Sequence, residues 1–140
     1  MDISRGFLLQ DPMVTIPWGI SESELKALLP SLRHVTTGYF TLPCTSLPGL
    51  THDLGFHFDP RANGKLVELE FFRRAYPDQE ASYREFQDHF VNHFGPPTVV
   101  QPSVDGFPSC EWRLGFITIR HFVIDRFGPE EHMRVQWHEV

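Results

Sequence analysis

The sequence predicts an α+β fold, in which a twisted antiparallel sheet carries two helices on one face. Three observations lead to this prediction. Two segments begin with helix-capping residues, most of the remaining chain alternates apolar and polar residues, and turn-forming residues separate the alternating segments. The chain has 140 residues, of which 41% are hydrophobic, enough for one packed core. We therefore expect a single α+β domain over residues 1–140.

A first helix is expected over residues 22–29. Ser21 can accept a hydrogen bond from the backbone N–H of Glu24 while the Glu24 carboxylate reaches back to Ser21, which is the arrangement of a capping box. Pro30 ends this helix, because proline has no backbone N–H to donate and disfavours a helical residue before it.

A second helix is expected to begin at Ser82, or one turn earlier at Asp78, since either side chain can cap a helix. It ends at Gly95, which two prolines follow. Aromatic residues recur along it at helical spacing and form one apolar face: Tyr83, Phe86, Phe90 and Phe94. We expect this face to cover the sheet.

Most of the remaining chain is expected to form strands. The segments with a strand pattern are 13–16, 35–42, 54–58, 66–72, 110–114, 116–124 and 133–138. Turn-forming residues 59–64 join two of them into a hairpin, whose core side would carry Phe56, Phe58, Val67, Leu69 and Phe71. Residues 101–108 are expected to form a loop, and Glu130 and Glu131 an acidic turn.

The order of a helix followed by strands occurs twice along the chain. At an offset of 66 residues several positions are identical, among them Cys44 and Cys110, and the last strand of each half shows the same alternation. This order predicts either a tandem repeat, over about 18–74 and 80–140, or one antiparallel sheet that receives two helices.

The charge balance disfavours nucleic acid as a partner. Lys and Arg number 12 and Asp and Glu number 18, giving a net charge of −6. Arg73 and Arg74 are the only adjacent basic pair, whereas a nucleic-acid-binding protein normally carries a basic stripe. A partner protein with a basic surface fits this charge better.

The sequence predicts a cytoplasmic protein with no membrane partner. The N-terminal apolar run covers only residues 7–9, whereas a signal peptide needs about 7–15 apolar residues. A membrane-spanning helix needs about 18 or more. Cys44 and Cys110 are expected to be reduced thiols, although one bridge would form in an oxidising compartment.

No motif specifies a catalytic chemistry or a cofactor. Phosphate-loop, dinucleotide-binding and serine-hydrolase motifs are absent from the sequence. His89 and His93 have the spacing of two metal ligands on one helix face, or of two histidines at the edge of the core. Either cysteine could act as a nucleophile only with a lowered pKa and a histidine nearby. We expect no metal and no cofactor.

Two glutamates lie on one side of an expected strand. The strand rise places Glu68 and Glu70 about 7 Å apart, which overlaps the carboxylate spacing of inverting glycosidases. Alternating glutamates also occur on any solvated strand. If helices cover only one face of the sheet, the other face stays open for binding. The residues expected to contact a partner there are Glu68, Glu70, Phe72, Glu111, Arg113, Arg134 and His138.

The duplicated order of a capped helix and antiparallel strands resembles the β-lactamase inhibitor protein fold, over residues 18–138. Residues 16–21 and 94–97 also resemble segments of small bacterial proteins of that architecture. The inhibitor family is secreted and has a disulfide in each unit, whereas this chain has one cysteine in each half and is expected to carry no signal peptide. A small acidic protein of this kind is similar to the immunity proteins that neutralise bacterial toxins.

We therefore expect a non-catalytic protein-binding module, an inhibitor or immunity protein that neutralises a bacterial toxin or enzyme through its exposed sheet face. The alternative is a small enzyme or ligand-binding domain with a histidine-containing pocket between sheet and helices. A third interpretation is a structural subunit of a homo-oligomer.

Overall fold

The computed structural model describes residues 2–62, 64–73, 78–103, 105–125 and 128–138. These residues form one 10-stranded antiparallel sheet and two helices, so the α+β class is confirmed, although strands dominate. The strands are β1 (Gly6–Asp11), β2 (Val14–Pro17), β3 (Arg33–Thr36), β4 (Tyr39–Ser46), β5 (Leu50–Asp59), β6 (Lys65–Phe72), β7 (Val99–Gln101), β8 (Ser109–Leu114), β9 (Ile117–Asp125) and β10 (Pro129–Trp137). The helices are α1 (Glu22–Leu28) and α2 (Gln79–Phe94), with a short 3₁₀ helix at Pro60–Ala62.

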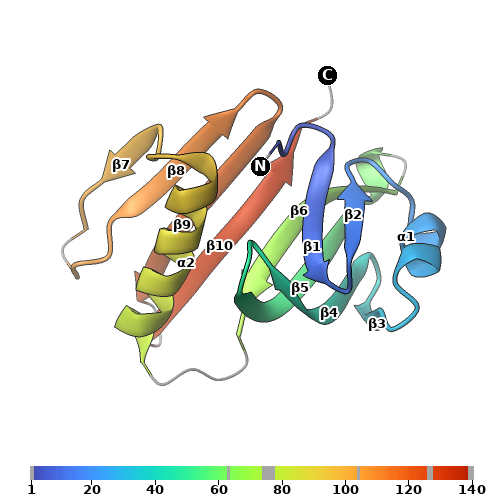
Figure 1. Cartoon of the computed structure of the whole chain (residues 1–140), viewed down its shortest axis with the longest axis horizontal. Helices are drawn as coiled ribbons and strands as arrows, with labels where there is room; N and C mark the ends of the chain where they lie inside the picture. Colours follow the sequence, from blue (N-terminus) through green and yellow to red (C-terminus); the bar gives the residue numbers. More distant parts are fainter. Residues whose placement is uncertain (1, 63, 74–77, 104, 126–127, 139–140) are drawn as a thin grey trace.

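The sheet has the order β2-β1-β4-β5-β6-β10-β9-β8-β7, and β3 pairs with β4 beside β1 (Figure 1). Strands β3–β6 follow α1 and strands β7–β10 follow α2, and within each group consecutive strands pair. The two groups meet where β6 pairs with β10. Leu69 lies opposite Val135 in that pair, and these residues are also 66 positions apart (135 − 69). The residues that face each other at the junction of the two groups are therefore equivalent positions under the 66-residue offset seen in the sequence.

Both helices begin at side chains that satisfy the backbone. The expected capping box is present at α1, where Ser21 accepts the N–H of Glu24 at 3.2 Å. α2 begins at the earlier of the two expected caps, because the Asp78 carboxylate accepts the N–H of Ala81 at 2.6 Å. Ser82 lies inside the helix, and its hydroxyl donates to Glu131 at 2.6 Å.

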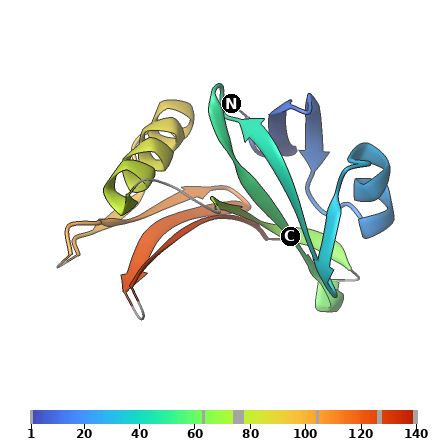
Figure 2. The same ribbon diagram turned by 90° about the horizontal axis from the view of Figure 1, so that it is seen from below.

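Both helices and the N-terminal hairpin lie on the same face of the sheet, which we call the covered face (Figures 1 and 2). Phe86 and Phe90 of α2 pack edge-on against Phe71 of β6, with ring centroids 6.5 and 5.2 Å apart. Phe7 of β1 contacts the same ring at 5.3 Å, so the hairpin β1–β2 folds over the sheet. On the other flank, the Lys26 ammonium of α1 lies over a core ring of β4.

Several local expectations are corrected. Residues 35–42 form two strands, because the chain turns between Thr36 and Tyr39 at Gly38, which has φ 74°. A β-bulge at Val67 of β6, opposite His57 and Phe58 of β5, shifts the hairpin register, so that Leu66 is buried in place of Val67. Strands β1 and β7 were not expected at all.

The expected acidic turn at Glu130 and Glu131 is wrong. Both residues belong to β10 and pair with Ile124 and Val123 of β9. The sequence pattern misleads here because a glutamate rarely faces a core. The carboxylate of Glu131 can nevertheless be buried, because Ser82 of α2 and His121 of β9 donate hydrogen bonds to it.

The cap of α2 gives a first test. Asp78→Ala should lower the free energy of unfolding by about 1 kcal/mol, because the Ala81 N–H loses its acceptor. Asp88→Ala removes the same side chain from an exposed position in the second half of α2 and should change stability little. Urea unfolding followed by tryptophan fluorescence measures both. Equal losses in the two variants would contradict the assignment of the cap.

Candidate functional site

The candidate site is the face of the sheet opposite to both helices, which we call the open face. Figure 2 shows α2 on one side of strands β8–β10 and no helix on the other side. Because side chains alternate along each strand, residues between buried neighbours point to this face. All seven expected partner-binding residues lie on it: Glu68, Glu70 and Phe72 on β6, Glu111 and Arg113 on β8, Arg134 on β10, and His138 just after β10.

Five of these seven side chains make ion pairs within the face. Arg134 is at the centre and contacts Glu68 at 2.9 Å and Glu70 at 3.0 Å. His57 of β5 lies 3.3 Å from Glu70, and Gln136 donates to Glu68 at 2.8 Å. Glu111 pairs separately with two arginines. The carboxylates are recessed, since the side chains of Glu68 and Glu70 are only 13% and 23% exposed.

The electrostatics of this network keep Glu70 charged. The hydrogen bond from His57 and the nearby Arg134 charge lower the pKa of Glu70, against the opposing effect of burial. A general acid needs a raised pKa. Glu70 therefore has the wrong shift for a glycosidase acid, and Glu68 is bound to the same arginine.

Tyr39 and His57 belong to this face and were not expected from the sequence. Their rings stack with centroids 4.5 Å apart. Tyr39 lies across Gly55, where an added Cβ would come within 2.8 Å of the tyrosine ring. A glycine inside an alternating strand often marks such a close approach, and that was the available signal.

Three hollows surround the network on the open face. The first measures about 480 Å³ and is lined by Arg33, His34, Val35, Tyr39, Thr41 and Phe72. The second, about 570 Å³, is lined by residues of β5, β6 and the end of β10, among them His57, Glu68, Gln136 and His138. The third, about 300 Å³, lies over β7–β9 and is lined by Val99, Gln101, Ser109, Cys110, Glu111, Arg113, Arg120 and Phe122.

The first hollow contains a buried hydroxyl without a partner. Thr41 is 4% exposed, and its Oγ1 makes no hydrogen bond within the part of the chain that the structure describes. Most buried polar groups are hydrogen-bonded, so the Thr41 hydroxyl, unpartnered among the described residues, is free to bond a group that enters this hollow. Phe72 and Tyr39 line the same hollow, which gives it aromatic walls.

The buried histidines line none of the hollows on the open face. His121 is fully buried beneath α2, with Nε2 2.5 Å from Glu131 and Nδ1 2.7 Å from Gln87. Tyr83 stacks on its ring at 4.3 Å. This histidine is therefore hydrogen-bonded on both nitrogens and packed into the covered face.

The cysteines are free and buried. Cys44 Sγ lies 3.8 Å from His52 Nε2, but burial raises the pKa of the thiol to about 12 and lowers the pKa of His52 to about 4. A nucleophilic thiol needs the opposite shifts. Cys110 accepts the amide N–H of Gln87 at 3.3 Å.

The two histidines expected as edge-of-core residues or metal ligands lie on α2. His89 Nδ1 is 2.9 Å from the carbonyl oxygen of Glu85. Within the described ranges no group of three or more His, Cys, Asp or Glu side chains is placed to hold a metal ion.

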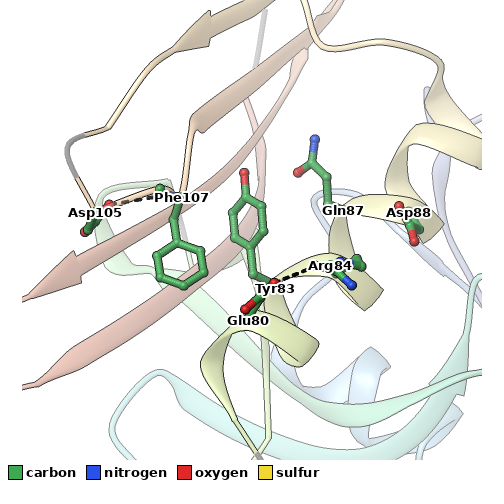
Figure 3. A pocket seen from close by; sticks show the side chains of 8 residues that line it. Glu80, Tyr83, Arg84, Gln87, Asp88, Asp105 and Phe107 are labelled. Carbon is green, nitrogen blue, oxygen red and sulfur yellow. Dashed lines mark hydrogen bonds and ion pairs between the residues drawn. The ribbon is translucent and has the colours of Figure 1, made fainter.

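A further hollow lies on the other side of the molecule, between α2 and the loop at 105–107 (Figure 3). It measures about 430 Å³, and Tyr83 and Phe107 face each other across it with ring centroids 5.4 Å apart. Glu80 on its rim is paired with Arg84 at 2.6 Å. None of the residues that line this hollow is a histidine, whereas His93 lines a separate hollow of about 300 Å³ at the C-terminal end of α2.

No protein-family model, no curated protein and no solved structure matches this chain. Neither of the two described helices is long and apolar enough to cross a membrane.

The buried His52 gives a pH-dependent test. Its pKa is about 4 in the folded protein and about 6.5 when unfolded, so between these values the unfolded chain binds a proton that the folded chain does not. Stability should therefore fall as pH drops from about 6.5 to 4, by on the order of 3 kcal/mol from this residue. His52→Phe should remove that part of the slope in urea unfolding measured from pH 8 to 4. An unchanged slope in the variant would contradict this origin.

The packing of the Tyr39 ring against Gly55 is tested by a double-mutant cycle. Gly55→Ala should destabilise the fold by about 1–3 kcal/mol, because the new methyl group overlaps the tyrosine ring. Tyr39→Ala removes that ring, so Gly55→Ala made in the Tyr39→Ala background should cost much less. Additive effects in urea unfolding would show that the two residues do not interact.

Proposed function

We propose that the open face binds another protein, and that the chain is a non-catalytic inhibitor or immunity protein that neutralises a bacterial toxin or enzyme. The observation that carries this proposal is a helix-free sheet face with three hollows around one ion-pair network. Half-buried aromatic residues lie beside the hollows: Tyr39, Phe72 and Phe122. Aromatic and arginine side chains set among polar groups are typical of the residues that dominate binding energy.

The network fixes the side chains of the face to one another in the absence of a partner. Arg134 is fixed by two carboxylates on the neighbouring strand, and Gln136 and His57 hold those carboxylates from both sides. A face that is already ordered loses less conformational entropy on binding. This supports a binding role over a loose solvated surface.

The breadth of the face supports the same proposal. We interpret β3–β6 and β7–β10, each with its helix, as a tandem repeat joined at the β6–β10 pair. Two such units make one continuous sheet, which is the arrangement on which the resemblance to the β-lactamase inhibitor fold rests. The two free thiols favour a reducing compartment such as the cytoplasm.

The net charge of −6 favours a partner with a basic surface. Glu68 and Glu70 are paired internally, so they contribute to long-range attraction more than to direct contact. Reversing either charge would place a lysine beside Arg134 and disturb the face itself. Binding is therefore better tested at Phe72, which makes no ion pair.

The experiment begins with affinity purification of the tagged chain from its native source, followed by chemical crosslinking and mass spectrometry to identify a stoichiometric partner. Phe72→Asp should then weaken binding of the purified partner by tenfold or more, as expected for a buried aromatic anchor. Leu28→Asp, at an exposed position of α1 away from the open face, is the matched control and should leave affinity unchanged.

If Leu28→Asp abolished partner binding and Phe72→Asp left it unchanged, the proposed face would be overturned. Crosslinks confined to α1 and α2 would overturn it as well. Turnover of a small-molecule substrate by the purified chain would overturn the non-catalytic role.

A further inference from the structure

We propose that Arg113 and Arg120 together form a binding site for a carboxylate of the partner protein. The inference rests on the proposed function and adds the chemistry that one part of the open face recognises. Arg113 lies on β8 and Arg120 on β9, and Glu111 is paired with Arg120 in the register of these two strands. All three side chains therefore lie together on the open face.

One carboxylate holds both guanidinium groups. Glu111 Oε2 contacts Arg113 Nε at 2.6 Å, and Oε1 contacts Arg120 Nε at 3.1 Å. Two positive charges against one negative charge leave the cluster with a net positive charge. A guanidinium has five N–H donors, and each contact here uses only the Nε. The terminal nitrogens of both arginines have no partner within the described ranges.

The terminal nitrogens are also accessible. The side chains of Arg113 and Arg120 are 63% and 53% exposed, whereas Glu111 between them is 21% exposed. Glu111 thus supports the two guanidinium groups from below and offsets their mutual repulsion. Hydrogen bonds from Arg113 and Arg120 lower the pKa of Glu111, so this support stays charged at neutral pH.

The surrounding hollow fits a side chain that ends in a carboxylate. It measures about 300 Å³, and Val99 and Phe122 supply apolar walls for the aliphatic part of an Asp or Glu side chain. A planar carboxylate matches the fork of a guanidinium and can accept two hydrogen bonds from it. One further carboxylate would bring the cluster to two positive and two negative charges.

The test is an NMR titration of the full chain with N-acetyl-glutamate α-amide, whose only charge is the side-chain carboxylate. The Nε–H signals of Arg113 and Arg120 should shift together and saturably. Arg113→Gln and Arg120→Gln should each weaken binding by up to about fivefold, the range of exposed ion pairs. Arg113→Lys should also weaken it, because lysine keeps the charge and loses the fork. Arg84→Gln, at an arginine of α2 whose side chain is 68% exposed and paired with one carboxylate, is the matched control and should have no effect.

N-acetyl-glutamine amide, which lacks the charge, should leave both Nε–H signals unshifted. Inorganic phosphate is the second arm, and saturation by phosphate without saturation by the carboxylate probe would overturn the proposal. Shifts of the Nε–H signals no larger at Arg113 and Arg120 than at Arg84 would overturn it too. In that case, loss of partner binding by Phe72→Asp would still support the open face. If the carboxylate binds but Phe72→Asp leaves partner binding intact, the arginine site stands and the proposed face fails.

Discussion

The pairing of β6 with β10 is the interaction on which the rest of the structure depends. It joins the two strand groups into one sheet and sets Leu69 opposite Val135, both fully buried. Because side chains alternate along a strand, the same register places the glutamates of β6 beside Arg134 on the other face. A slip of one residue would bury those charges and expose the core. Core and candidate site are therefore specified by one set of backbone hydrogen bonds.

The faces of these strands could be predicted from local pattern, because alternation with a period of two is visible within a few residues. Glu68, Glu70 and Arg134 were accordingly expected on one face, and they lie there. Their mutual contacts could not be predicted, since β6 and β10 are separated by a helix and three strands along the chain. Local pattern contains no information about which strands become neighbours. Side chains expected to meet a partner therefore proved to be paired with one another.

Two buried histidines also have surroundings that local sequence pattern could not predict. In the sequence, His52 and His121 look like ordinary strand residues. In the structure each lies beneath α2, with its ring centroid 6.3 Å from that of Phe86. One is held neutral by burial, and the other lies against a buried carboxylate of β10. That carboxylate was expected in a turn, because the sequence does not show the helix side chain that binds it from 49 residues away. Buried polar groups depend on such distant partners.

The net charge of the chain and the charges exposed on its open face have opposite signs, so they act differently on a partner at long range and in contact. The exposed carboxylates lie largely away from the open face, as at Glu80 and Glu85 of α2, whose side chains are 72% and 47% exposed. On the open face the most exposed charges of the ion pairs are the arginines Arg113 and Arg120, whereas the carboxylate of Glu111 between them is recessed. Attraction over distances near the Debye length of about 8 Å depends on total charge, whereas contact depends on the groups at the surface. A partner that is basic overall would be drawn towards this chain, and the groups it places on Arg113 and Arg120 would have to be acidic. Such a mixed requirement would exclude uniformly basic proteins, so it would add selectivity to the attraction.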